Sequence, residues 1–182
     1  MKIIPLSILF IVLSLSSCTQ NALTLWSSSN PSPSTTPYTK LSFPPAKGFV
    51  NDFAHVITDP QELELESILD DLQEREKIDV VVALIEDTGG RNIFDYSLEM
   101  AREWKIGSEN GGVLLVVAVK DRKWHIQISK KTEEYLSNED VRKIGEVMVP
   151  DFKDQHYGEA IGKCIDALIT ELSRKQGFKL AM

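Results

Sequence analysis

Four side chains with oxygen donors flank the predicted strands and could together bind a divalent cation. They are Asp52, Asp87, Asn110 and Glu133. Hard cations such as Ca²⁺ and Mg²⁺ take their ligands from carboxylate and amide oxygens, and ligands of open α/β sheets bind where the loops gather at the strand ends. We therefore predict a Ca²⁺ or Mg²⁺ site on these residues and expect no other cofactor. The alternative is structural: Asp52 caps a turn, Asp87 begins a polar loop and Glu133 is solvated.

Lipid attachment is the second chemistry that the sequence indicates, at Cys18. A positive Lys2 and an apolar run precede this cysteine, and the run is shorter than the roughly 20 residues of a membrane span, as is typical of a secretory signal. The stretch Leu15-Ser16-Ser17-Cys18 resembles a bacterial lipobox. The resemblance implies cleavage between Ser17 and Cys18, diacylglycerol on the sulfur and acylation of the new α-amino group. A plain secretory signal and a buried N-terminal helix remain alternatives.

The lipobox also implies a location. Acylated Cys18 would hold the chain to the bilayer in the cell envelope, on the periplasmic side. Thr19 follows the cysteine, and the lack of an aspartate there favours the outer over the inner membrane.

Other catalytic patterns are missing from the sequence. Cys164 is the only other cysteine, so an acylated Cys18 leaves it without a disulfide partner, and its helical face predicts a core position. The histidines His55, His125 and His156 are too far apart to predict a metal cluster. Neither a Gly-x-Ser-x-Gly elbow, a Walker loop nor a Cys-x-x-Cys pair is present. Asp121-Arg122 is interpreted as a polar turn.

Composition limits the partners. The 27 acidic residues against 20 Lys and Arg give a net charge of −7, and no basic cluster is visible along the chain. Nucleic acid is therefore not an expected partner. An acidic surface also avoids anionic headgroups, so membrane contact is left to the anchor. The expected protein partner is an unidentified membrane or periplasmic protein.

Four segments follow from the composition. Residues 1–17 form the signal peptide, and residues 18–45 form the lipidated N-terminus and a Ser/Pro-rich linker that cannot bury enough apolar surface to fold. Residues 46–177 form one α/β domain, and residues 178–182 a short tail.

The apolar periodicity of the domain predicts its elements. A helix begins after an N-cap at Asp59, and a second helix runs from about Ile93 to Lys105. Continuous apolar runs at 79–85 and 113–119 predict strands that are covered on both faces. Residues 120–123 form a turn to an alternating, half-exposed strand, and two more helices finish the chain, the first from Ser137 to a break at Pro150. Because two-faced strands need helices on both sides, the expected architecture is a helix–sheet–helix sandwich with a mixed sheet.

Three short motifs resemble the TPM domain, a family named for a thylakoid lumen protein, a photosystem II repair protein and a receptor modulator. They are Asn51-Asp52-x-Ala54, Trp104-x-Ile106-Gly107 and Asn110-Gly111-x-Val113-Leu114-Leu115. The resemblance covers about residues 48–172. It implies a Rossmann-like α/β sandwich, and associates the chain with phosphatase activity, divalent-metal binding and the assembly or repair of membrane complexes.

One departure from the family pattern bears on function. Relatives commonly have Gly-x-Gly-Leu-Glu after the hairpin, whereas this chain has residues 129–136, SKKTEEYL. Glycine permits a close ligand approach that lysine does not. We therefore favour a non-catalytic binding module that supports assembly, turnover or repair of membrane protein complexes. The alternative is a divalent-metal-dependent phosphatase.

Overall fold

The computed structural model describes residues 42–107 and 109–178. The predicted signal peptide, Cys18 and nearly all of the predicted linker lie outside these residues. Within the described part of the chain, no helix has both the length and the apolar character that a membrane crossing requires.

The described chain forms a mixed sheet and helices of unequal length. The strands are β1 (Val50–Asp52), β2 (Asp79–Ile85), β3 (Gly112–Ala118) and β4 (Lys123–Ile128). The helices are α1 (Asp59–Glu76), α2 (Ile93–Glu103), α3 (Asn138–Glu146), α4 (Val149–Lys153) and α5 (Tyr157–Gln176), with a 3-10 turn at Thr132–Glu134.

The sheet has the strand order β1-β2-β3-β4. β1, β2 and β3 are parallel, with Val82 beside both Val50 and Leu115, and β4 returns antiparallel to β3. The carboxyl ends of the three parallel strands therefore share one edge of the sheet with the β3–β4 turn. We call this the C-terminal edge.

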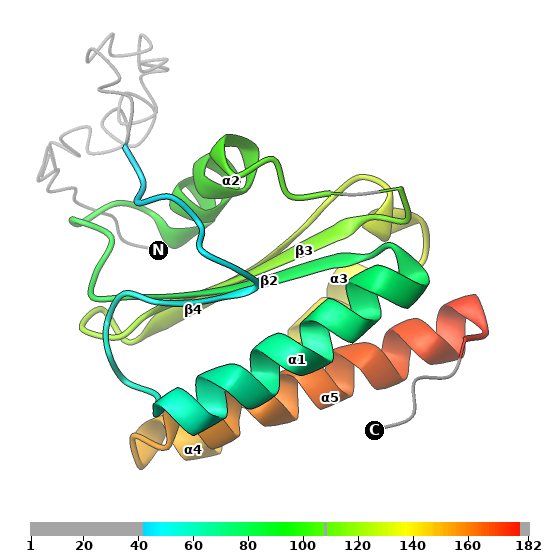
Figure 1. Ribbon diagram of the computed structural model, residues 1–182. Helices are drawn as coiled ribbons and strands as arrows, with labels where there is room; N and C mark the ends of the chain where they lie inside the picture. The colour runs from blue at the N-terminus through cyan, green and yellow to red at the C-terminus, as the bar shows by residue number, and fades with distance from the viewer. Residues whose placement is uncertain (1–41, 108, 179–182) are drawn as a thin grey trace, which may run out of the picture. The chain divides into compact units, whose positions relative to one another are not determined.

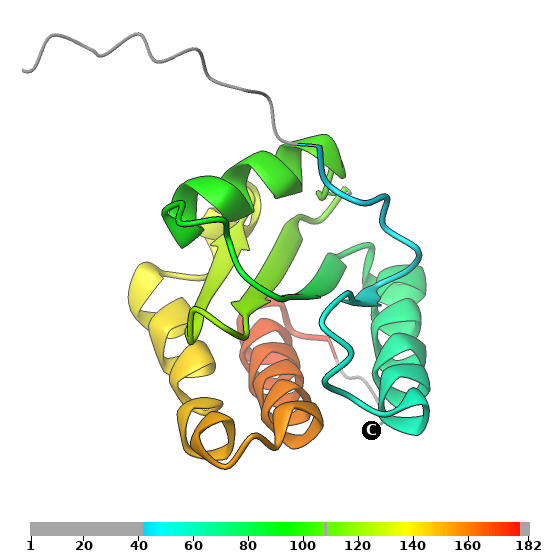
Figure 2. The ribbon, with the colours of Figure 1, turned by 90° about the vertical axis from the view of Figure 1, so that its left-hand side faces the viewer.

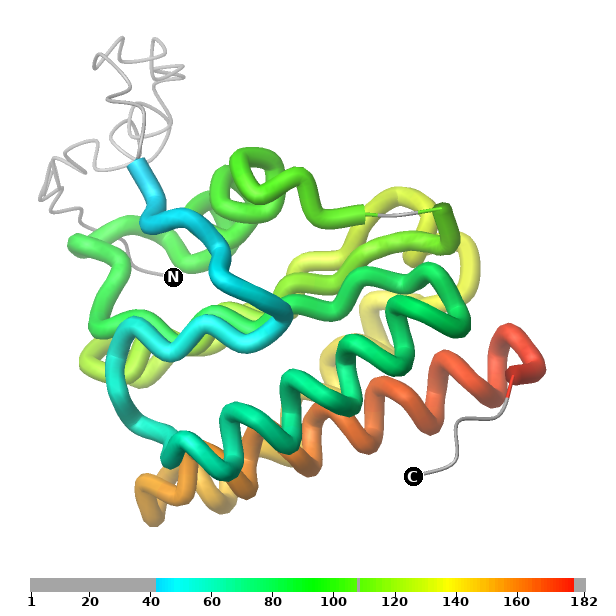
Figure 3. The backbone as a smooth tube through the Cα atoms, viewed as in Figure 1, coloured from blue at the N-terminus to red at the C-terminus, as the bar shows by residue number. Residues whose placement is uncertain are grey.

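Helices cover both faces of the sheet (Figures 1 and 2). Alternate residues of β2 divide between two cores: Val80, Val82 and Leu84 pack with α1 and α5, whereas Val81, Ala83 and Ile85 pack with α2. Figure 3 shows α1 and α5 running side by side on the larger helical layer. The predicted α/β sandwich with an antiparallel hairpin is confirmed, and the apolar strand runs are its cause.

The helix ends agree with local capping rules, with small shifts from the prediction. α1 has Thr58 rather than Asp59 as its N-cap, in a capping box with Gln61. The predicted box between Ser137 and Asp140 opens α3. Pro150 does not simply break the chain, because it lies in the first turn of α4, where a missing N–H costs nothing.

The packed part begins earlier than the predicted boundary at residue 46. Phe43 is buried against the α2 side of the sheet, with its ring 5.1 Å from that of Tyr96. The Trp104 indole donates a hydrogen bond to the Pro44 carbonyl at 3.0 Å. Composition predicts a linker here because Pro44, Pro45 and the serine-rich residues before them are typical of unfolded segments.

Candidate functional site

The structure does not bring the four predicted metal ligands together. Asp52 ends β1 and Asp87 follows β2, so both lie at the C-terminal edge. Asn110 precedes β3, and Glu133 follows the antiparallel β4, so both lie at the opposite edge. Among the residues that the structure describes, no group of three or more His, Cys, Asp or Glu side chains could hold a metal ion.

Asp52 holds a turn together. Its Oδ1 accepts the Ala54 N–H at 3.1 Å, and its Oδ2 accepts those of Val56 and Ile57 at 2.7 and 2.9 Å. A carboxylate offers about four lone-pair positions. Asp52 therefore uses most of its acceptor capacity on its own backbone, as the structural alternative expected.

The other three residues also have local contacts. Asp87 Oδ1 accepts the Gly89 N–H at 2.8 Å, and Asn110 Nδ2 donates to the Glu76 carbonyl at 2.7 Å. Glu133 is exposed in the 3-10 turn. These contacts shape loops at two separate edges.

Asp121 joins two loops at the C-terminal edge. Its Oδ2 accepts the Thr88 N–H at 3.0 Å and lies 2.7 Å from the Thr88 hydroxyl oxygen. Thr88 is buried. These hydrogen bonds lower the pKa of the Asp121 carboxyl, because they favour its charged form. The polar turn predicted at Asp121-Arg122 is thus the attachment of the β3–β4 turn to the β2–α2 loop.

A second contact joins the same strand ends. The Lys120 ammonium lies 2.5 Å from Glu86 Oε2, and the Lys120 N–H donates to the Glu86 carbonyl at 2.8 Å. The ion pair raises the pKa of Lys120. With Asp121, this contact defines the position of the β3–β4 turn.

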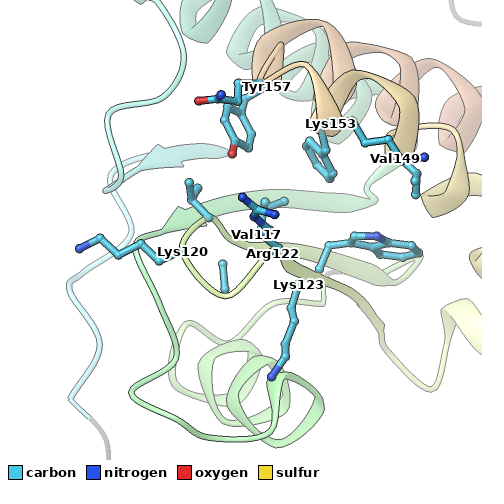
Figure 4. Close-up of a pocket in the computed structure, with 12 residues that line it drawn as sticks. Val117, Lys120, Arg122, Lys123, Val149, Lys153 and Tyr157 are labelled. Atoms are coloured by element: carbon cyan, nitrogen blue, oxygen red, sulfur yellow. The ribbon is translucent and has the colours of Figure 1, made fainter.

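A pocket of about 610 Å³ opens beside that turn, against α4 and the start of α5 (Figure 4). We call it the cationic pocket. Four of its lining residues are cations, three are aromatic, and the others are apolar or uncharged. They are Lys120, Arg122, Lys123 and Lys153; Trp124, Phe152 and Tyr157; and Val117, Ala118, Val119, Val149 and Gln155.

The far wall of the pocket comes from α4 and α5. Lys163 of α5 binds Asp151 of α4 through contacts of 2.7 and 3.0 Å, and the rings of Phe152 and Tyr157 are 5.5 Å apart. This packing forms the part of the pocket wall that Phe152, Lys153 and Tyr157 contribute.

The cations of this pocket are largely without counter-ions. The side chains of Arg122 and Lys153 form no hydrogen bond or ion pair with any residue in the described ranges, and Lys123 is attracted by Asp121 without a direct contact. Only Lys120 is paired, with Glu86. The pocket therefore gathers positive charge on a chain whose net charge is −7.

Sequence reasoning missed this cluster. The sequence predicts only a turn at residues 120–123, and Lys153 is far along the chain from them. Folding places α4 beside the turn, so that Lys153 joins the cations of the turn. The structure therefore has a cationic cluster although the linear sequence shows none. The one available signal was the run Lys120-Asp121-Arg122-Lys123 itself.

Cys164 is no candidate nucleophile. It lies buried in α5, and burial raises the pKa of its thiol to about 12. The thiol therefore stays protonated at neutral pH, whereas nucleophilic cysteines act as thiolates. Its predicted core position is confirmed.

The family follows from a comparison with known domains. A family model described as the TPM domain matches residues 50–171. The chain belongs to the TPM domain family. Among curated proteins, UPF0603 protein YdjH of Bacillus subtilis (strain 168) is 26% identical over 128 residues, which cover 70% of this chain. The match spans 49% of YdjH, about half of its length.

Solved structures share the fold of this TPM domain. The N-terminal domain of a protein from P. gingivalis has a TM-score of 0.65 and 23% identity, covering 74% of this chain and 87% of that one. The N-terminal domain of the cg2496 protein from Corynebacterium glutamicum has a TM-score of 0.58 and 11% identity, covering 78% and 90%. BA42 protein from Bizionia argentinensis has a TM-score of 0.58 and 19% identity, covering 65% and 83%.

The segment that departs from the TPM pattern has a defined structure. Ser129 Oγ and Thr132 Oγ1 each accept the Gly112 N–H at 3.0 Å, and Thr132 is fully buried. Hydroxyl groups thus attach the 3-10 turn to the start of β3. The loop is built by side-chain hydrogen bonds rather than by glycine conformations.

Proposed function

We propose that this TPM domain is a non-catalytic binding module of a lipid-anchored envelope protein, and that it supports the assembly, turnover or repair of membrane protein complexes. The observation that carries the proposal is the cationic pocket. It offers unpaired cations and aromatic surface to a ligand, and it is not lined by an acid, a cysteine or a histidine that could transfer a proton or attack a substrate.

The state of the acidic residues nearby supports binding over catalysis. Asp121 is engaged by Thr88, and Asp52 by three backbone N–H groups. A phosphatase that uses a divalent metal needs ligands that converge on the ion. Asp52 and Asp121 instead hold a turn and a loop in place.

The proposed partner is a membrane or periplasmic protein that docks at the pocket. A photo-crosslinking amino acid in place of Lys153, which is exposed and lines the pocket, should capture a specific protein in native membranes, identified by mass spectrometry. The same probe in place of Lys130, exposed beyond β4 at the opposite edge, is the matched control. Equal crosslinking from both positions, or none from Lys153, contradicts the proposal.

The anchor is tested separately. Labelled palmitate should be incorporated into the full chain and should be absent from Cys18→Ser. Incorporation into both, or into neither, removes the lipid anchor from the proposal while leaving the binding module to be judged by crosslinking.

Catalysis has its own test. The Cys18→Ser chain should not hydrolyse p-nitrophenyl phosphate, with or without Ca²⁺ or Mg²⁺. Metal-dependent turnover that is lost in Asp87→Ala would contradict the non-catalytic binding module and favour a phosphatase.

A further inference from the structure

We infer that the cationic pocket receives an acidic segment of the partner protein, in which carboxylates flank an apolar or aromatic side chain. This inference rests on the proposed function and specifies the chemistry of the partner. Three properties of the pocket carry it: its charge, its apolar wall and the separation of its cations.

The positive charge of the pocket lining favours a negatively charged ligand. Lys120, Arg122, Lys123 and Lys153 line the pocket, and no aspartate or glutamate does. Arg122 and Lys153 have no hydrogen-bond or ion-pair partner among the described residues. A ligand with carboxylates would supply those partners, and complementary charge also speeds the encounter of two proteins.

The pocket also offers apolar and aromatic surface to a ligand. Val117, Trp124, Val149, Phe152 and Tyr157 contribute to the lining. Aromatic side chains bury large areas and are enriched where proteins bind one another. A ligand that consisted of charge alone would leave this surface in water, whereas a peptide side chain can cover it.

The separation between the cations favours an extended acidic peptide over a compact anion such as phosphate. Lys120 and Lys123 extend away from the pocket in different directions, and Tyr157 faces it from α5 (Figure 4). Tight binding of a single phosphate needs donors that converge on one point. Charges spread around the mouth instead match carboxylates spaced along an extended chain.

The rest of the molecule argues against a long polyanion. The net charge of −7 disfavours binding of nucleic acid and of anionic membranes, which present negative charge over a wide area. A short acidic segment is attracted by the pocket and extends little beyond it. A short acidic peptide is therefore the occupant that fits both the positive charge of the pocket and the negative net charge of the chain.

The test uses the full Cys18→Ser chain and a fluorescent synthetic peptide with acidic residues on both sides of one phenylalanine. Anisotropy at low salt should show binding that weakens about tenfold in Arg122→Glu and in Lys153→Glu, because each reversal turns an attraction into a repulsion. Lys130→Glu makes the same change in net charge at the opposite edge and should leave the affinity within about twofold.

Two further probes separate the ligand classes. A peptide with Gln and Asn in place of the acidic residues should not bind, and neither inorganic phosphate nor vesicles of anionic phospholipid should displace the acidic peptide. Equal weakening in Lys130→Glu, binding of the neutral peptide, or displacement by phosphate or vesicles would each overturn the inference.

The two proposals fail differently. If the probe at position 153 crosslinks a specific protein but no acidic peptide binds, the binding module stands and the inference about its partner is wrong. If the peptide binds only through Lys120, Arg122, Lys123 and Lys153 and crosslinking yields no protein, the pocket chemistry stands and the proposed envelope role is wrong.

Discussion

Asp121 shows how one side chain can position a whole edge of the sheet. Its carboxylate accepts hydrogen bonds from Thr88, and so ties the β3–β4 turn to the β2–α2 loop. The same turn carries Arg122 and Lys123 to the cationic pocket. A change at Asp121 is therefore expected to affect both the stability of the fold and the pocket. The pH dependence of the unfolding free energy isolates the effect on stability.

Asp121→Asn should be less stable than the unmodified chain at pH 7, by an amount that shrinks in acid. In the unfolded chain the carboxyl titrates near its ordinary pKa of about 4, and in the folded chain its pKa is lower. The charged form therefore stabilises the fold above about pH 4, and this contribution is lost as the pH falls through the lowered value. Urea unfolding of both chains from pH 7 downward measures the difference.

The control for that series is Asp154→Asn, which removes an exposed carboxylate next to α4. No side-chain hydrogen bond or ion pair is seen for Asp154 among the described residues. A parallel pH-dependent loss in both variants would show that general charge, rather than the Thr88 contacts, is responsible.

Cys164 should resist thiol reagents in the folded chain. Its thiol is buried, and its pKa is raised to about 12, so neither access nor ionisation favours reaction. In the Cys18→Ser background, Ellman's reagent should label Cys164 only at the rate of unfolding and at full rate in urea. Rapid labelling of the native chain would contradict its place in the core.

At the scale of the elements, α3 and β4 meet through a close contact at a glycine. A methyl group on Gly145 would collide with the indole of Trp124, which also lines the cationic pocket. Because protein cores tolerate little extra volume, α3 can approach β4 here only with glycine. The helix thus fixes the ring that forms part of the pocket wall.

Gly145→Ala should destabilise the fold by about 1–3 kcal/mol, because overpacking outweighs the gain in helix propensity. Gly162→Ala in α5 is the matched control, since nothing lies within 4 Å of its added methyl group. That variant should be stabilised by about 0.5–1 kcal/mol. Urea unfolding measures both, and opposite signs are expected. Stabilisation of Gly145→Ala would show that Trp124 moves freely.

At the scale of the whole molecule, Phe43 extends the folded part beyond the boundary that composition predicts. Its ring is buried beside Tyr96, and Pro44 accepts the Trp104 hydrogen bond. Phe43→Ala in the full chain should lower the free energy of unfolding by about 3 kcal/mol, the cost of removing a packed phenylalanine. Ser42→Ala, at an exposed neighbour, should change it by less than about 0.5 kcal/mol. Similar effects of both substitutions would place the boundary back at residue 46.

The parts of this fold that sequence could predict are those with strong local patterns. The apolar runs of β2 and β3 and the capping box at Ser137 indicate their elements directly. β1 has only three residues, too few for periodicity, and the Glu66 carboxylate binds the Phe49 and Val50 N–H groups at its start. Such long-range contacts leave no local pattern.

The candidate site was less predictable for a related reason. Carboxylates near strand ends could be recognised in the sequence, but whether Asn110 and Asp87 share an edge depends on strand direction and order. The structure places them at opposite edges. Lys153 joins Arg122 only through the packing of α4, which the sequence did not predict as a helix.

The entry of the chain at Phe43 and the cationic pocket lie on opposite layers of the sandwich. Phe43 belongs to the α2 layer, whereas Trp124 and Phe152 pack with the core on the other face of the sheet. The two features therefore do not share a surface of the folded domain. A ligand that filled the pocket would leave the contacts of Phe43 with the α2 layer untouched.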